Sequence, residues 1–305
     1  MEIYTYTEQE NQRIDVFLAE KLDLSRSKIQ KLIKSGDVCV NDKVIKKTSF
    51  LLVQDDKIKI NLTEDPEEII VPDDDITLDI VFQNQDFLIL NKPAFLSMHP
   101  TNFSQSNTLA NYLIKYFPNL KNVGEDKLRP GIVHRLDKDT SGLLIIPLNN
   151  ESFFEFKTKF QNKEIKKTYI ALVSGKLKEK QGVLDIPITK SQQKFNRRKV
   201  AVVPDKFTKE AITEYEVLQE FKNESLLKVN LKTGRTHQIR VHFAAISNFI
   251  IGDTEYGSTK VNKKYALNRQ FLHSSQLDFN FKNKDYSFSS ELPKDLSNIL
   301  ENLKS

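Results

Sequence analysis

The 305-residue chain lacks several features that would each point to a particular class of protein. It has one cysteine, Cys39, so it can form no internal disulfide and cannot build a cysteine-rich metal site. No apolar run approaches the ~20 residues that a membrane-spanning helix requires. The N-terminus has no basic segment followed by an apolar core, so no secretory signal is visible. These absences favour a cytoplasmic globular protein, which we expect to be a monomer.

Charge is unevenly distributed, although the net charge is only +5. Residues 61–80 hold eight acids and no base, whereas residues 11–60 carry a net charge of +4 and residues 81–305 a net charge of +12. Two basic bodies joined by an acidic segment favour a polyanionic partner, with nucleic acid as the first candidate, although a generic solvated surface is the alternative. We interpret residues 62–75 as an acidic linker extended by self-repulsion. The predicted domains are residues 1–61 and 76–305.

The first domain is predicted to contain two short helices followed by a hairpin. Ser25 is a candidate N-cap for the second helix, and Gly36 is a candidate C-terminal stop. A polar turn at Asn41-Asp42, between two short apolar runs, favours a hairpin. The unit resembles S4-type RNA-binding domains, in which the second helix and the hairpin face RNA. A helical cap whose lysines are merely solvated is the alternative. The residues expected to contact RNA are Arg26, Lys28, Lys31 and Lys34.

The second domain is organised around the stretch from Gly131 to Ile146. Two apolar runs, Ile132-Val133 and Leu143–Ile146, predict buried strands. Between them lie a histidine, an arginine and two acids, closed by a Thr-Ser-Gly turn. We expect this polar segment to be a loop on a rigid scaffold, where reactive groups tend to lie.

The string His134-Arg-Leu-Asp137, followed by Thr140-Ser-Gly, resembles the signature of the RluA/RluD family of pseudouridine synthases. Two further family motifs follow in order. They are Lys167-Thr-Tyr169 on an alternating strand and Gly234-Arg-Thr-His-Gln-Ile-Arg240 at a strand-to-helix junction, where Thr236 is expected to cap the helix. The resemblance implies that Asp137 is the catalytic carboxylate, Tyr169 the active-site tyrosine and Arg235 the cation paired with Asp137. Further residues expected to bind the substrate are His134, Arg135, Thr140, Ile239 and Leu272.

Taken together, the resemblances imply an α+β protein. A small S4-type domain would precede a mixed, largely antiparallel sheet core with flanking helices. A family-like Asn91-Lys-Pro93 and a His99-Pro100 occur upstream, either at the floor of the active site or, more simply, in a proline-fixed turn that shapes the sheet. The phenylalanines of the helix after the signature loop are most simply explained as core packing.

The three implied catalytic residues suffice for a metal-free attack on a nucleoside, and no cofactor is expected. Asp137 is a carboxylate nucleophile, and a cation is needed to keep the pKa of a buried acid low. Tyr169 offers a ring for stacking on uracil and a hydroxyl that could move a proton. The uridine must be flipped out of structured RNA at a cost of about a few kcal/mol, and Arg135 is a candidate to fill the vacated space. Attack at C1′ of the ribose and attack at C6 of the base both remain open.

Large-subunit ribosomal RNA is the first candidate substrate and transfer RNA the second. Three other classes of function are alternatives. A hydrolytic glycosidase needs a second carboxyl ~5–9.5 Å from the first, and the sequence offers only Asp139 of the same loop. A non-catalytic RNA-binding ribosome-assembly factor would keep the fold without the reaction. A metal enzyme could use histidine and carboxylate ligands, namely His134, Asp137, His237 and His242.

Overall fold

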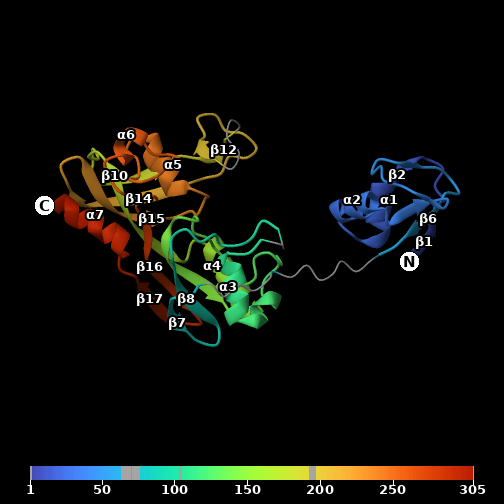
Figure 1. The fold of residues 1–305 in the computed structure, drawn as a ribbon, viewed down its shortest axis with the longest axis horizontal. Helices are drawn as coiled ribbons and strands as arrows, with labels where there is room; N and C mark the ends of the chain where they lie inside the picture. Colours follow the sequence, from blue (N-terminus) through green and yellow to red (C-terminus); the bar gives the residue numbers. More distant parts are fainter. Residues whose placement is uncertain (1, 63–69, 71–75, 103–104, 192–196, 305) are drawn as a thin grey trace. The chain divides into compact units, whose positions relative to one another are not determined.

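The structure is a computed structural model that describes residues 2–62, 70, 76–102, 105–191 and 197–304. The chain divides into two compact units, Met1–Glu68 and Ile69–Ser305, which Figure 1 shows as ribbons. The division falls within the predicted linker, most of which lies outside the described residues. Ile70 is described, and it is buried against Ala110 and Ile114 of the second unit. This part of the predicted linker is therefore bound to the second unit.

The first unit contains two helices and a small sheet. Helix α1 spans Ile14–Leu22 and helix α2 spans Arg26–Ser35. Both predicted ends of α2 are confirmed, because the Ser25 hydroxyl accepts a hydrogen bond from the Lys28 N–H (3.3 Å) and Gly36 has a φ of +95°. The strands form a sheet in the order β1-β6-β3-β4 and a separate pair β2-β5. Their bounds are Glu2–Thr5 (β1), Gln12–Arg13 (β2), Val38–Val40 (β3), Lys43–Val44 (β4), Leu51–Leu52 (β5) and Lys57–Ile60 (β6).

Helix α2 has one buried apolar side and one exposed basic side. Its isoleucines and leucine belong to the core of the first unit, whereas Lys28, Lys31 and Lys34 are exposed. Arg26 differs, because its Nε lies 3.0 Å from a carboxylate oxygen of the buried Asp15. The three lysines are therefore displayed to solvent, while Arg26 also serves an ion pair within the unit.

The second unit is built on a nine-stranded sheet in the order β11-β14-β15-β10-β16-β9-β8-β7, with β17 paired to β16. Within the described residues, β9 and β16 pair in parallel and the other neighbours pair antiparallel. The predicted α+β class is confirmed. The strand bounds are Ile80–Gln83 (β7), Phe87–Lys92 (β8), Ser141–Pro147 (β9), Lys166–Ser174 (β10), Gln181–Asp185 (β11), Ile212–Glu220 (β14), Glu224–Leu231 (β15), Leu272–Phe281 (β16) and Lys284–Ser289 (β17), with a separate pair Ile188–Lys190 (β12) and Arg198–Val200 (β13).

Strand β9 is buried on both faces. Leu144 and Ile146 belong to one core cluster, and Leu143 and Ile145 belong to another. A strand covered on both sides has a continuous apolar run instead of an alternating one, as here. The helices of the unit are Leu109–Tyr116 (α3), Asn150–Gln161 (α4), Gln238–Ala245 (α5), Thr259–Asn262 (α6) and Lys294–Lys304 (α7), with a 3-10 helix at Pro118–Asn122 (η1).

Only the second of the two apolar runs around the signature loop forms a strand. Residues 143–146 lie within β9, as predicted, but Ile132-Val133 forms no strand, so that prediction is wrong. The Ile132 N–H instead donates to the Arg129 carbonyl (3.1 Å) in a turn. Gly142 lies beside Ser274 of β16, and a Cβ at Gly142 would lie only 2.2 Å from the Ser274 carbonyl oxygen. This close backbone approach requires glycine where the loop enters the sheet.

Candidate active site

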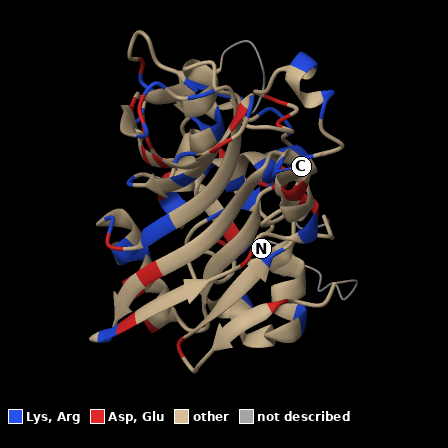
Figure 2. Cartoon of the chain, turned by 90° about the vertical axis from the view of Figure 1, so that its left-hand side faces the viewer, with Lys and Arg blue, Asp and Glu red and all other residues tan. Residues whose placement is uncertain are grey.

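A pocket of about 580 Å³ lies between three segments of the second unit. They are the loop before β9, the end of α4 with the start of β10, and the turn between β15 and α5. Asp137 is the one acid among the described residues that line it. Lys and Arg residues are spread over the strands and loops of this part of the chain (Figure 2). A pocket with this charge suits a polyanionic ligand. Its basic lining residues are Arg129, Arg135, Lys157, Lys163, Lys167, Lys232, Arg235 and Arg240.

Asp137 lies in the loop before β9, and its carboxylate is bound by an arginine of α5. The Arg240 Nη1 donates to Oδ2 of Asp137 (3.2 Å). The Asp137 carbonyl accepts the N–H of Thr140 (3.1 Å), which closes a turn around the acid. The Asp137 side chain is 15% exposed. The arrangement offers one oriented carboxylate to a ligand in the pocket.

Arg240 is in turn held by two further carboxylates. Its Nε and Nη2 form a bidentate pair with Asp253 (2.7 and 2.9 Å), and Nη2 also donates to Glu255 (3.2 Å). Burial alone would lower the pKa of Arg240, but Asp253 and Asp137 raise it above its ordinary value. Burial alone would likewise raise the pKa of Asp253, but Arg240 holds it below its usual range. The guanidinium therefore stays charged and fixed in direction.

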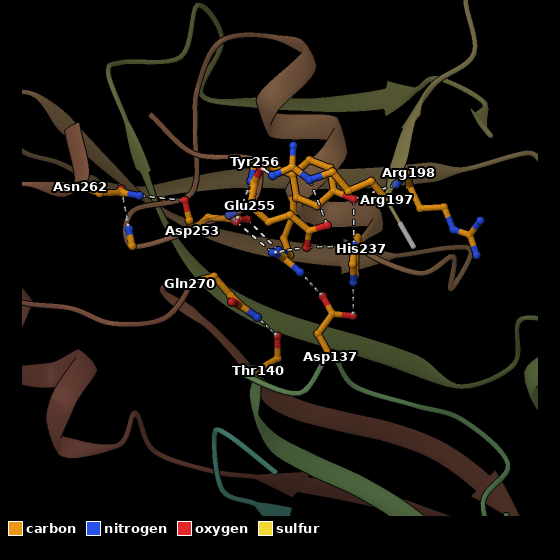
Figure 3. A network of polar contacts seen from close by, with 12 residues as sticks. Asp137, Thr140, Arg197, Arg198, His237, Asp253, Glu255, Tyr256, Asn262 and Gln270 are labelled. Carbon is orange, nitrogen blue, oxygen red and sulfur yellow. Dashed lines mark hydrogen bonds and ion pairs between the residues drawn. The ribbon is translucent and has the colours of Figure 1, made fainter. Parts of the chain in front are cut away.

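His237 and Tyr256 complete this network, as Figure 3 shows. The His237 Nε2 lies 3.9 Å from an oxygen of Asp137, and its Nδ1 lies 2.9 Å from the Tyr256 hydroxyl. Burial lowers the pKa of His237 although Asp137 opposes the shift. The Tyr256 ring lies 5.0 Å from the Arg240 guanidinium carbon. His237 is therefore a neutral neighbour of the Asp137 carboxylate, and Arg240 is the cation that pairs with this carboxylate.

The prediction that Arg235 pairs with Asp137 is wrong. Arg235 lines the pocket but is exposed, and its Nε donates to the backbone carbonyl of Glu210 (2.9 Å). The pairing belongs to Arg240, five residues further along the same motif. The motif contains both arginines, and the resemblance assigned the role to the first.

The physical reason is the place where α5 begins. Thr236 was predicted to cap the helix, but the N-cap is His237, in a left-handed conformation with φ 59°. The Gln238 side chain fixes the turn before it, because its Oε1 accepts both the Arg235 N–H (3.0 Å) and the Thr233 hydroxyl (2.8 Å). Residue 235 consequently lies in the turn outside the helix, and Arg240 lies within the first helical turns.

Tyr169 lies on β10, is 5% exposed and lines the pocket. Burial raises the pKa of Tyr169 above its ordinary value, and the charge of Asp137 raises it further, although a hydrogen bond with Ser274 opposes the shift. The register between β10 and β16 shifts between Thr168 and Tyr169. The extra residue at this shift is Ser275 of β16, whereas β10 stays in register with β15 on its other side. The phenol therefore stays neutral at neutral pH and lies near the carboxylate.

Two buried cations hold the backbone of the signature loop. The Lys92 Nζ donates to the carbonyl of Lys138 (2.9 Å), and the Arg269 Nη1 donates to the carbonyl of Asp139 (3.2 Å). Burial lowers the pKa of Lys92 to about 7, against the opposing charges of Asp139 and Asp137. Arg269 also pairs with Asp295 of α7 (2.6 Å). The loop is thus anchored from β8 and from the last helix.

Each of the predicted substrate-binding residues lines the pocket, although their environments differ. The His134 Nε2 accepts the N–H of Ile145 (2.9 Å), its ring stacks on Phe160 (centroids 4.4 Å apart), and burial lowers its pKa to about 3. Phe160, which was expected in the core, packs against a core cluster and also lines the pocket. Arg135 is exposed. The remaining three are buried: Thr140, Ile239 and Leu272.

The geometry does not favour the metal enzyme or the glycosidase. No group of three or more His, Cys, Asp or Glu residues within the described part of the chain could hold a metal ion. The His242 Nε2 lies 2.9 Å from the Ile186 carbonyl oxygen instead. Asp139 is not among the described residues that line the pocket, so the second carboxyl that a glycosidase needs is not supplied by it.

None of the described helices is long and apolar enough to span a membrane.

Comparisons with known proteins agree with this site. Residues 86–245 match the family model for RNA pseudouridylate synthase, and residues 12–58 match the S4 domain. The chain is 35% identical to "Uncharacterized RNA pseudouridine synthase YlyB" of Bacillus subtilis, over 100% of this chain and 98% of that protein. It is 36% identical to "Ribosomal large subunit pseudouridine synthase D" of Zymomonas mobilis, over 95% of this chain and 93% of that protein.

A solved structure shares the fold over most of this chain. "Human RNA Pseudouridylate Synthase Domain Containing 1" superimposes with a TM-score of 0.60 at 22% identity, over 77% of this chain and 98% of that chain. The resemblance predicted from the motifs at Asp137, Tyr169 and Arg235–Arg240 is confirmed at the level of the family. Because the family model spans more than half of the chain and relatives of similar length share over 30% of its residues, the chain belongs to the RNA pseudouridine synthases, a family of isomerases, and carries an S4 domain ahead of its synthase domain.

Proposed function

We propose that this enzyme converts specific uridines of large-subunit ribosomal RNA into pseudouridine, with Asp137 as the nucleophile. One observation carries the proposal: the one acid among the described pocket residues is held by Arg240 in a pocket that Tyr169 also lines. The choice of RNA is supported by relatives named "Ribosomal large subunit pseudouridine synthase D", which are 34–36% identical to this chain.

The reaction exchanges one bond to the ribose for another. The bond between N1 of uracil and C1′ breaks, and a bond between C5 and C1′ forms. If Asp137 attacks C1′, its oxygen displaces uracil through N1, the base turns, and C5 then displaces the carboxylate. If Asp137 adds to C6 instead, the same two bonds are exchanged while the base is tethered, and the bond between C6 and the carboxylate oxygen then breaks to release Asp137. In both routes C5 loses a proton and N1 gains one, so the product is an isomer.

The side chains around Asp137 have separate tasks in this proposal. The hydrogen bond from Arg240 orients the carboxylate toward the ligand. Tyr169 offers its ring to the base, and its raised pKa keeps its hydroxyl protonated, so it does not start the reaction as a base. Asp137 itself, once released from the ligand, is then the base for the C5 proton. The buried side chains of Ile239 and Leu272 exclude water, which favours rejoining over hydrolysis.

The test is to map pseudouridines in RNA from cells with and without this protein, and to restore the protein as wild type or as Asp137→Asn. We expect specific sites in large-subunit ribosomal RNA to disappear and to return only with wild type. The purified Asp137→Asn protein should lose at least about 10³-fold in turnover and keep its affinity for RNA, because only the nucleophile is removed.

Asp285→Asn is the matched control, since Asp285 is an exposed carboxylate at the start of β17 that does not line the pocket. Substantial turnover by Asp137→Asn would refute the assignment of the nucleophile. Sites that disappear from transfer RNA alone would move the proposal to that substrate. Full rescue of growth and of RNA function by Asp137→Asn, without modification, would favour a non-catalytic assembly factor.

A further inference from the structure

Lys167 and Arg235 lie close together on the pocket wall, and neither has a carboxylate partner within the described residues. Lys167 is on β10 and Arg235 is in the turn before α5. The Lys167 ammonium lies 5.5 Å from the centre of the Phe160 ring. Arg235 contributes only its Nε, to the Glu210 carbonyl. Two adjacent cations without an acid repel each other unless an anion joins them.

Most other cations of the pocket are neutralised by the protein itself. Lys163 pairs with Glu210 at 3.2 Å, and Lys232 pairs with Glu214 at 3.2 Å. Lys157 pairs with Glu125, and Arg129 lies 3.4 Å from Asp126. Arg240 has three carboxylates around it. The acids near Lys167 and Arg235 are therefore engaged elsewhere, and these two cations stay available.

The cost of burying Lys167 indicates that its charge has a use. Burial and, to a smaller extent, the charge of Arg235 together lower the pKa of Lys167 to about 8. His134, the titratable neighbour on the loop side, is neutral and cannot compensate. Lys167 is partly buried, and a partly desolvated ammonium without an acid is destabilised until an anion in the pocket pairs with it.

The position of Lys167 relative to the reacting groups identifies the anion. Lys167 and Tyr169 are two residues apart on one strand, so their side chains share a face and are separated by about 7 Å. If the base lies against Tyr169 and the ribose lies at Asp137, the phosphate attached to that ribose lies within one sugar's width of the Lys167 ammonium. We propose that Lys167 and Arg235 together bind a backbone phosphate that flanks the flipped uridine. This subsite rests on the function proposed above.

Phosphate binding here does two things for the reaction. A fixed phosphate positions the ribose at Asp137, because the sugar can no longer slide along the pocket. The contact also carries no information about the base, so it contributes to affinity for every RNA strand that enters. The rival explanation is structural: the lysine stem only covers Phe160. Lys167→Met keeps an apolar stem and removes the charge, and Lys167→Arg keeps the charge.

The experiment uses the full chain and a short RNA hairpin that contains a mapped target uridine. We expect Lys167→Met to raise KM about 10- to 100-fold with a smaller change in kcat, because one charged contact to phosphate is lost. The salt slope of binding should fall by about one. Lys167→Arg should restore most of the affinity. Lys166→Met is the matched control, since Lys166 is an exposed neighbour on the same strand.

A hairpin with a neutral methylphosphonate in place of one flanking phosphate tests the partner directly. On wild type, the substitution at the bound phosphate should cost as much affinity as Lys167→Met, and on the variant it should cost little more. The proposal is overturned if Lys167→Met and Lys166→Met have equal KM. It is also overturned if, at both flanking phosphates, the affinity losses caused by the methylphosphonate and by Lys167→Met are fully additive. The wild-type arm does not depend on the variant's folding. Binding of the two hairpins can also be measured without turnover, so failure of this subsite is distinguished from failure of the proposed reaction.

Discussion

The two cationic sites of this pocket are built in opposite ways. Arg240 has Asp253, Glu255 and Asp137 around it and is neutralised by the protein. Lys167 and Arg235 have no carboxylate among the described residues. In the first site the Arg240 guanidinium pairs with carboxylates of the protein. Because these acids neutralise it, it is not expected to attract an anionic ligand. In the second site the charge is left for the ligand. The placement of acids, more than that of bases, therefore separates the cation that pairs with Asp137 from the two cations that we propose bind phosphate.

The largest effect should come from Arg240→Met, which removes the centre of the acid-ringed site. We expect kcat to fall about 10²- to 10³-fold, because Asp137 loses the donor that orients it. Stability should fall by about 3–5 kcal/mol, because Asp253 is left as a buried, unpaired charge. Steady-state kinetics and urea unfolding measure the two effects.

Arg235→Met is the control that sharpens the comparison, since it should act mainly on KM. If it lowered kcat as much as Arg240→Met, the two arginines would not have the separate roles that their contacts indicate.

A smaller effect is expected from Asp253→Asn, and it should depend on pH. The pKa of Asp253 is lower in the folded protein than its ordinary value. Its ionised form therefore stabilises the fold above the unfolded-state pKa of about 4, and this stabilisation is lost as pH falls through the folded-state pKa. At pH 7 we expect Asp253→Asn to cost about 2 kcal/mol. In urea unfolding the gap to wild type should close at the most acidic pH at which both proteins fold. A constant gap across pH would mean that shape, not charge, holds Arg240.

The smallest effect concerns the first unit, where Lys31 and Lys34 also have no acid partner among the described residues. We expect the double change to Gln to weaken RNA binding a few-fold and to reduce the salt slope by about two, because each lysine that contacts a phosphate displaces a counterion. Lys59→Gln is the control, since Lys59 pairs with Asp42 within the unit. An equal slope in both variants would remove the lysines of α2 from the RNA-binding surface.

Local signals in the sequence predicted much of the fold. The two ends of α2, at Ser25 and Gly36, were predicted correctly because helix caps depend on a few adjacent residues. The alternation around Tyr169 predicted β10, and Tyr169, Ala171 and Val173 do share one core cluster, although the opposite face of the strand, with Leu172, is buried in another. Ile132-Val133 was misassigned because two apolar residues are too few to separate a strand from a turn that packs against the core. The helix start at His237 was missed because its left-handed backbone is fixed by Gln238, not by a cap.

The site was predicted less completely than the fold. Asp137 and Tyr169 lie on the pocket as predicted, because both belong to short motifs. Arg240 was missed because the same motif contains two arginines, and only the three-dimensional turn decides between them. Lys92 belongs to the Asn91-Lys-Pro93 motif, which was expected either at the floor of the active site or in a turn that shapes the sheet. Its bond to the Lys138 carbonyl, and that of Arg269 to the Asp139 carbonyl, were not predicted because they join residues far apart along the chain.

Arg269 has a consequence for how the protein can be damaged or controlled. The Arg269 guanidinium connects the carbonyl of Asp139 to the carboxylate of Asp295, so α7 supports a loop that lies some 160 residues earlier in the sequence. A stop codon just before α7 would remove this support and leave every described pocket residue in the chain. A peptide that displaces α7 would have the same effect. Changes in α7 are thus expected to alter the backbone of the loop that carries Asp137, although no described residue of α7 lines the pocket.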